Sequence, residues 1–282
     1  MQKPRHILPL SAALAAAAAL AAWGQATRPQ FEVASVKPAG SRGAATLRRL
    51  PGRLTGRAPL RALIQTAYDV EPFQIEGGPQ WIGSEPYEID AKAAGDPDRA
   101  RMFLMLQSLL EDRFQLRIHR ESREMPVYAL AAARGGLKLP PGNEKCAEEA
   151  EELIGPLAIP GTRIPLAGAP ASGCSGLDVT IGAAGARIRS DHASMAGFVR
   201  VLSRVLGRPV SDRTGFSGVF DVTMDFLPDD ATTGLPPPPP GANPPAGLSI
   251  FGALQQLGLR LEATRAPVEV LVIDHVDRPS AN

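Results

Sequence analysis

The chain has 282 residues, of which 44% are hydrophobic and 21% are charged, and its formal net charge is +1. A net charge this close to zero gives no indication of nucleic-acid binding. The length can bury a substantial core and suits one large domain or two small ones.

The N-terminus has the three parts of a secretory signal. Lys3 and Arg5 supply positive charge, residues 7–23 form an uncharged apolar stretch, and the Gly-Gln-Ala sequence that follows suits signal peptidase. We therefore predict a signal peptide over residues 1–26 and an exported mature protein, periplasmic or secreted, that begins at Thr27. An uncleaved membrane anchor is the competing interpretation, but the alanine-rich stretch is short for a span of about 20 strongly apolar residues.

The first unit of the mature chain covers residues 27–133 and alternates helices with short strands. Residues 59–68 place apolar side chains at the spacing of one helix face and begin with a proline, which is typical of a first helical turn. In chain order we predict a strand at 52–56, the helix at 59–68, a strand at 87–91, a second helix, and two strands at 116–118 and 126–130 joined by a turn at 121–125.

A second unit, residues 186–282, repeats this order with strands at 186–190, 220–224, 259–261 and 267–271 and a short turn at 264–266. Its first helix, with Ser194 as N-cap, repeats the apolar spacing of the earlier helix at a constant offset. The equivalences that we predict are Leu63 with Phe198, Ile89 with Val222, and Val127 with Val268.

The predicted fold class is therefore α+β. It consists of two tandem β-α-β-β-α-β-β units, each with its helices packed on one face of a mixed or antiparallel sheet. Unit two also contains a proline-rich stretch at about 228–247, including five successive prolines, which favours an exposed, disordered loop. A docking site for a proline-reading partner is the alternative interpretation of that stretch.

Residues 134–185 form a Pro/Gly-rich linker that holds both cysteines, Cys146 and Cys174. An exported protein meets an oxidising compartment, so we predict a disulfide between them. By the chain-entropy estimate it would stabilise the fold by about 3 to 4 kcal/mol. Two free thiols are the alternative, and no neighbouring His or third Cys suggests a zinc site.

The common enzyme motifs are missing: there is no Gly-x-Ser-x-Gly elbow, His-Glu-x-x-His pair, Walker A loop or dinucleotide glycine fingerprint. Alternation places His119 on the solvent side of its strand, and His192 precedes a helix. Asp274 and His275 are adjacent in a strand and so point to opposite faces, which prevents them from pairing with each other. We interpret these residues as structural, with metal binding or catalysis as the alternative.

Two features are candidates for ligand binding. The Gly-Gly-Pro-Gln turn at 77–80 fixes the place of Trp81, which either packs over the helix at 59–68 or forms a stacking platform. The densest basic cluster is Arg48, Arg49, Arg53, Arg57 and Arg61. It is interpreted either as a solvated face, with Leu47, Leu50, Leu54 and Leu60 as buried partners, or as a site for an anion or acidic surface. Trp81, Arg53 and Arg57 are the candidate ligand-binding residues.

Five segments resemble the soil-associated secreted protein family built on domain of unknown function 3738. They are the run Phe-Glu-Val-Ala-Ser-Val-Lys-Pro at 31–38, Gly-Gly-Pro-Gln-Trp at 77–81, residues 106–119, Met-Pro-Val-Tyr-Ala-Leu at 125–130, and Val-Glu-Val-Leu-Val-Ile-Asp-His at 268–275. The resemblance implies export but no established activity or catalytic residue. Related domains are attached to antibiotic-sensor-type membrane peptidases, which implies a sensing or binding role. Residues 198–222 also resemble the small N-terminal domains of secretins and TonB-dependent receptors in their order of helix, turn and strand.

These observations predict a non-catalytic cell-envelope protein that binds a protein or peptide, by pairing along an exposed sheet edge. The first alternative is a small-ligand-binding or sensing protein, with a pocket between the units near Trp81 and the arginines. The second is a hydrolase of unrecognised type that uses His119 or His275. We predict no cofactor, no metal, no nucleic-acid partner and no membrane-spanning segment in the mature protein.

Overall fold

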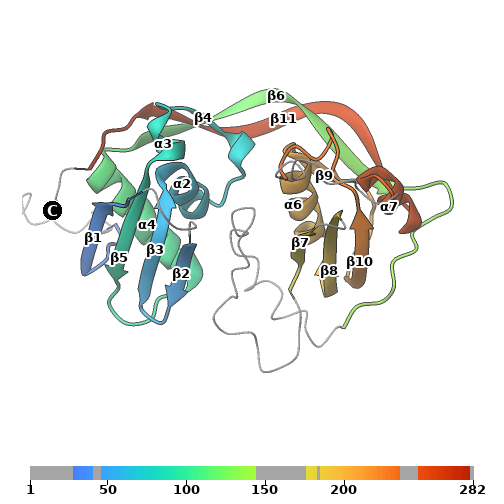
Figure 1. The fold of residues 1–282 in the computed structure, drawn as a ribbon, viewed down its shortest axis with the longest axis horizontal. Coiled ribbons are helices and arrows are strands. Elements are labelled where there is room, and N and C mark those ends of the chain that lie inside the picture. The colour runs from blue at the N-terminus through green and yellow to red at the C-terminus, as the bar shows by residue number, and fades with distance from the viewer. Residues whose placement is uncertain (1–27, 41–45, 144–175, 183–184, 236–246, 280–282) are drawn as a thin grey trace, which may run out of the picture.

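The computed structural model describes residues 28–40, 46–143, 176–182, 185–235 and 247–279. The predicted signal peptide, Thr27, both cysteines and the five successive prolines lie outside these residues. The described chain is a mixed α+β structure, which confirms the predicted class. It forms two lobes that a long two-stranded ribbon bridges (Figure 1).

The first lobe is built on a four-stranded antiparallel sheet of order β1-β5-β3-β2. Its strands are β1 (Val33–Pro38), β2 (Thr46–Leu50), β3 (Arg53–Pro59) and β5 (Pro86–Lys92). The helical elements are α2 (Leu60–Tyr68), the short η1 (Pro72–Gln74), α3 (Trp81–Ser84) and α4 (Arg99–Phe114). The side chain of Asp98 caps α4 by accepting a hydrogen bond from the backbone N–H of Arg101.

The second lobe has a three-stranded antiparallel sheet of order β10-β8-β7. Its elements are β7 (Asp178–Gly182), β8 (Gly185–Ser194), α6 (Met195–Leu206), β10 (Val219–Phe226) and α7 (Ile250–Gln256). Ser194 caps α6, as predicted, by accepting from the N–H of Gly197. Strand β7 lies within the segment that we assigned to the linker.

Each lobe has its own hydrophobic core on the helix side of its sheet. In the first, Tyr87 from β5 meets Phe114 from α4 edge to face, with ring centroids 5.0 Å apart. In the second, Phe198 from α6 meets Phe220 from β10 in the same manner at 5.5 Å. These buried aromatic pairs fix how helix and sheet pack in each lobe. Four leucines of the basic cluster were expected to be buried. Leu54 and Leu60 are buried, whereas Leu47 is half-buried and Leu50 is exposed.

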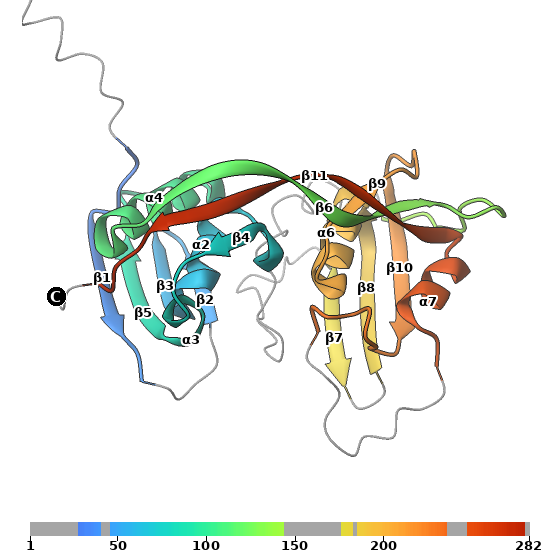
Figure 2. The same cartoon turned by 90° about the horizontal axis from the view of Figure 1, so that it is seen from above.

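The ribbon consists of β6 (Arg117–Ala132) and β11 (Leu259–His275), which pair antiparallel over their whole length. Figure 2, the view from above, shows both strands passing over the two lobes without a break. Two short strands complete this third sheet: β4 (Ile75–Gly77) pairs in parallel with β11, and β9 (Val210–Asp212) pairs in parallel with β6.

The ribbon corrects the predicted turns at 121–125 and 264–266, because both segments lie inside continuous strands. Prolines favoured the interpretation as turns, yet Pro126 fits the strand. The N–H of Tyr128 donates outward to the carbonyl of Pro209, so Pro126, two residues away, also faces outward, where no ribbon hydrogen bond is lost. Pairing within each unit is thus replaced by pairing between the two units.

Candidate functional site

The first sheet has one face that no described helix covers. Helices α2 and α4 pack against the face that carries Val36, Leu54 and Ile89, so the alternate side chains point away from the core. Cross-strand register arranges the outward side chains in three rows: Lys37, Glu88, Arg57 and Thr46; Ser35, Asp90, Thr55 and Arg48; Val33, Lys92, Arg53 and Leu50. We call this surface the basic face.

The basic face holds five cationic side chains and two carboxylates, a formal charge of +3. Arg53 pairs with Asp90, with 2.6 Å between Nε and Oδ1, and the hydrogen bonds from Arg53 hold the pKa of Asp90 below its usual value. Arg57 donates to the carbonyl of Gly40. Among the described residues, Lys37 and Lys92 have no carboxylate within ion-pair distance. The face therefore keeps cationic groups available to a partner.

The corresponding face of the second sheet has no such excess. Its outward rows, from β10 through β8 to β7, are Asp225, Arg187 and Thr180, and then Thr223, Arg189 and Asp178. Arg187 pairs with Asp225 at 2.6 Å, and the outward side chain of Asp221 adds a further negative charge. Two sheets of the same layered construction thus differ in the charge of their open faces.

Trp81 lies on the core side of the first sheet, whereas Arg53 and Arg57, the other candidate ligand-binding residues, point outward from it. Arg61 donates to the carbonyl of Ile75, near the turn that leads to Trp81.

The ring of Trp81 packs against the first core, meets Tyr87 edge to face, and is covered by the guanidinium of Arg278 at 5.0 Å from the ring centroid. Arg278 in turn forms two hydrogen bonds to Glu85, of 2.9 and 2.7 Å. Trp81 therefore anchors the segment that follows β11 to the first lobe.

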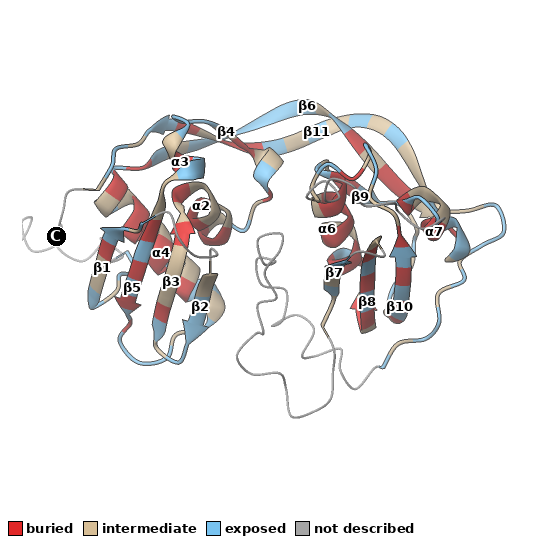
Figure 3. Ribbon diagram, in the orientation of Figure 1, coloured by how far each residue is buried: buried red, intermediate tan, exposed pale blue. Residues whose placement is uncertain are grey.

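The long edges of the ribbon are poor templates for an added strand. In the section between β4 and β9, each ribbon strand pairs with the other and with no further described strand, so its outer edge is unpaired. Figure 3 shows this middle section as largely exposed. The edges carry Pro126 and Pro267, and charged side chains alternate along them, including the ion pair between Arg120 and Glu269. Natural proteins use prolines and charges of this kind to prevent edge pairing.

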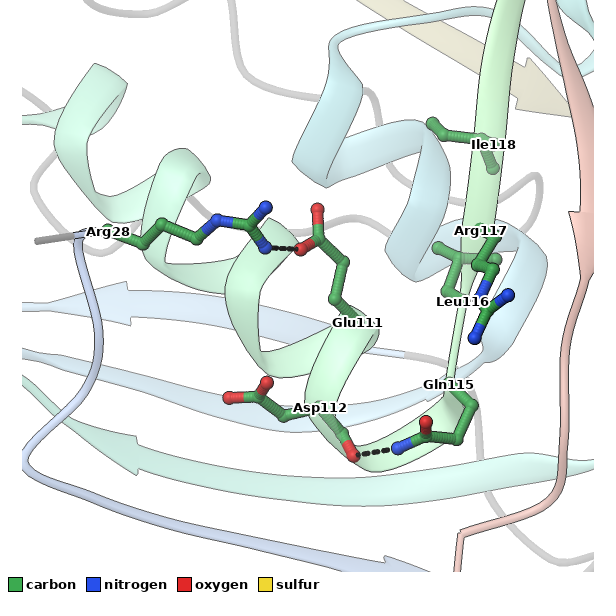
Figure 4. A pocket seen from close by; sticks show the side chains of 7 residues that line it. All are labelled: Arg28, Glu111, Asp112, Gln115, Leu116, Arg117 and Ile118. Atoms are coloured by element: carbon green, nitrogen blue, oxygen red, sulfur yellow. Dashed lines mark hydrogen bonds and ion pairs between the residues drawn. The ribbon is translucent and has the colours of Figure 1, made fainter. Parts of the chain in front are cut away.

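A polar cavity of about 450 Å³ opens where α4 ends and β6 begins (Figure 4). Its lining combines charges of both signs with two apolar side chains: Arg28, Glu111, Asp112, Gln115, Leu116, Arg117 and Ile118. The cavity lies in the first lobe, whereas sequence analysis expected a pocket between the units near Trp81. Gln115, in the left-handed conformation that ends α4, donates from Nε2 to the carbonyl of Asp112 at 2.9 Å.

Tyr68 is a half-buried phenol at the end of α2. Burial raises its pKa to about 12, and the negative charge of Glu111, which lines the cavity, acts in the same direction. The hydroxyl is therefore neutral at physiological pH.

His119 and Asp274, which were predicted as separate structural residues, meet in the structure. Nδ1 of His119 lies 2.9 Å from Oδ1 of Asp274, and both side chains are about half exposed. His119 lies opposite Val272, so alternation places Asp274, two residues further along β11, on the same face as His119. Only the pairing of β6 with β11, which the sequence did not predict, makes this contact possible. His275 instead contacts Asp277 at 3.1 Å.

His192 is 1% exposed and its Nδ1 contacts Asp191. In the described part of the chain, no group of three or more His, Cys, Asp or Glu side chains is arranged to hold a metal ion. Nor, among the same residues, is any helix long and apolar enough to cross a membrane.

A comparison with protein-family models matches residues 61–276 to the family described as a protein of unknown function, DUF3738. The chain belongs to this family. The match begins within α2 and ends just beyond β11, so it includes the second lobe, the ribbon and the first lobe from α2 onward. Strands β1, β2 and β3 lie before it. No curated protein and no solved structure matches the chain.

Proposed function

We propose that this member of the DUF3738 family is an exported, non-catalytic binding protein that docks an acidic protein or peptide of the cell envelope on its basic face. The observation that carries the proposal is the contrast between the two open sheet faces. Because the second sheet does without a cationic excess, the fold does not require one, and the charges of the first sheet are available for recognition.

The composition of the basic face favours a polypeptide over a lipid surface. Carboxylates and hydroxyls lie between the cations, so the face offers both donors and acceptors, as a polypeptide does. The exposed apolar side chains, Val33 at 68% and Leu50 at 36%, stand at opposite ends of one row, where they form no continuous patch.

Binding of this kind depends on ionic strength, because exposed charges are screened over about 10 Å at 0.1 M salt. The test compares the native chain with the triple variant Lys37→Glu, Arg48→Glu and Lys92→Glu on immobilised poly-glutamate at low and at physiological salt. We expect the native chain to bind with a salt-dependent affinity and the variant to lose at least tenfold. A matched control, Arg134→Glu, Lys138→Glu and Arg213→Glu, makes the same change in net charge at exposed positions elsewhere and should keep its affinity.

Vesicles that contain phosphatidylglycerol provide the second arm of this experiment. Binding to the vesicles without binding to poly-glutamate would contradict a polypeptide partner and identify a lipid surface instead. An equal loss of affinity in the triple variant and in the matched control would show that net charge alone governs binding. That result would refute specific binding at the basic face.

The cavity beside α4 favours a second candidate function, the binding of a small ligand. Its cationic and anionic side chains lie close together, an arrangement that suits a zwitterion such as an amino acid or dipeptide. A thermal-shift screen of such compounds should then identify a stabilising ligand whose effect is lost in Asp112→Asn. No shift with any zwitterion at millimolar concentration would remove this candidate.

A further inference from the structure

The two halves of the chain exchange strands in the ribbon sheet. We refer to residues 28–143 as the first half and to residues 176–279 as the second. Strand β4 of the first half pairs with β11 of the second, with Ile75 opposite Leu271. Strand β9 of the second half pairs with β6 of the first, with Val210 opposite Tyr128. Each half therefore adds a strand to the long strand of the other.

This exchange follows a constant spacing in the sequence. Val210 follows Ile75 by the same 135 positions by which Met195, the first residue of α6, follows Leu60, the first residue of α2. The two strand additions are thus equivalent contacts, and they relate the halves as the subunits of a symmetric dimer are related. Register is off by one residue at Ile89 and Val222. Ile89 lies opposite Gly56, four residues before α2, whereas Val222 lies beyond a register shift, opposite Ser190, five residues before α6. The equivalent of Val127 in the ribbon is Val270 rather than the predicted Val268.

The cores are shared in the same reciprocal way. Leu271 and Ile273 of the second half are buried in the first core, and Leu130 of the first half is buried in the second core. An ion pair reinforces the junction, since Arg204 of α6 binds both carboxylate oxygens of Glu71, at 2.8 and 2.6 Å. Neither core is complete without residues from the other half.

From these contacts we propose that the halves form a self-sufficient heterodimeric interface, and that a half pairs equally well with the complementary half of a second copy of this chain. The peptide link supplies only proximity. A covalent link raises the effective concentration of each half near the other, so dilute protein closes on itself. Exchange between copies then requires the link to be cut or the protein to refold at high concentration.

The first experiment inserts a protease site after Gly161 in the full chain, with Cys146→Ala and Cys174→Ala so that no disulfide holds the fragments together. The folded protein is cut and then analysed by size-exclusion chromatography with light scattering. We expect the cut halves to elute together at the mass of the intact chain. Elution as two separate species would overturn the proposal.

Urea unfolding provides an internal control. The unfolding midpoint of the cut protein should rise with protein concentration, because folding has become bimolecular, whereas that of the uncut variant should not change. A midpoint of the cut protein that is independent of concentration would show that each lobe folds alone, against the proposal. This comparison also separates failed association from failed folding of the variant.

The second experiment tests the second copy as partner. Cut protein with an affinity tag on its first half is mixed with untagged cut protein, partly unfolded in urea, and refolded by dilution. Capture through the tag should recover untagged second halves from both pools, in proportion to their amounts; isotope labelling of the untagged pool distinguishes them by mass. Recovery of labelled second halves at background level would contradict exchange.

Discussion

Met125 lies directly opposite Ala266 in the middle of the ribbon. Each residue belongs to a segment that sequence patterns predict as a turn within its own unit. Their pairing shows that the two segments open into strands because each finds its partner in the other half. The ribbon in which they pair bridges the two lobes (Figure 1).

The junction between the halves also gives a prediction about stability. Arg204 and Glu71 are 22% and 11% exposed at their side chains, so removing one partner leaves the other charge poorly solvated. We expect Arg204→Ala to lower the free energy of unfolding by about 1 to 3 kcal/mol, measured by urea denaturation. Arg200, whose pair with Asp69 is 36% and 45% exposed, is the control and should cost less than about 1 kcal/mol when changed to Ala. Equal losses would contradict the role of burial.

The contact of Arg278 with Glu85 predicts a pH dependence. The hydrogen bonds from Arg278 lower the pKa of Glu85, so this carboxylate contributes stability above its unfolded pKa and loses that contribution as pH falls through its folded pKa. In Arg278→Ala the pKa of Glu85, followed by NMR titration, should rise toward its ordinary value. The stability difference between variant and native chain should be largest at neutral pH and smaller in acid, where only the loss of the contact with Trp81 remains. A pKa of Glu85 that is unchanged would refute the assignment, and Arg117→Ala serves as the control.

The histidines should not be needed for binding. His119 and His275 are half exposed, and their changes to Ala should each alter stability by less than about 1 kcal/mol. His192 is buried, and His192→Ala should cost about 1 to 3 kcal/mol through the cavity it leaves. All three variants, once folded, should retain affinity for poly-glutamate. Turnover of any substrate that one of these changes abolishes would favour a hydrolase instead.

Export predicts a defined N-terminus. Intact-mass measurement of protein from the envelope or culture fraction should give a chain that begins at Thr27, because charge, apolar stretch and cleavage sequence coincide. A chain in that fraction that still carries Met1 would disprove cleavage.

The compartment also predicts the state of the cysteines. Thiol titration of unfolded, unreduced protein from the same fraction should find no free thiol, since Cys146 and Cys174 are the two cysteines of the chain. Protein made in a reducing cytoplasm is the comparison and should give two. Two free thiols in the exported protein would contradict the disulfide.

Local patterns in the sequence determine much of this structure. The apolar spacing from Leu60 onward, the cap at Ser194 and the alternation around Ile89 and Val222 depend on neighbours within a few residues, and the structure has these elements as expected. Because these patterns are local, the α+β class could be predicted from the sequence. The basic cluster could also be recognised, although not which of its arginines share a face of the sheet.

Only the tertiary structure decided how distant segments combine. The pairing of β6 with β11, the contact of Asp274 with His119 and the cover of Trp81 by Arg278 each join residues more than 100 positions apart. The alternation of side chains in a strand predicts which of them are buried. It does not predict which other strand pairs with it, because the backbone hydrogen bonds are the same for every partner strand. The charge of the basic face likewise arises from four strands in register, a sum that no single segment contains.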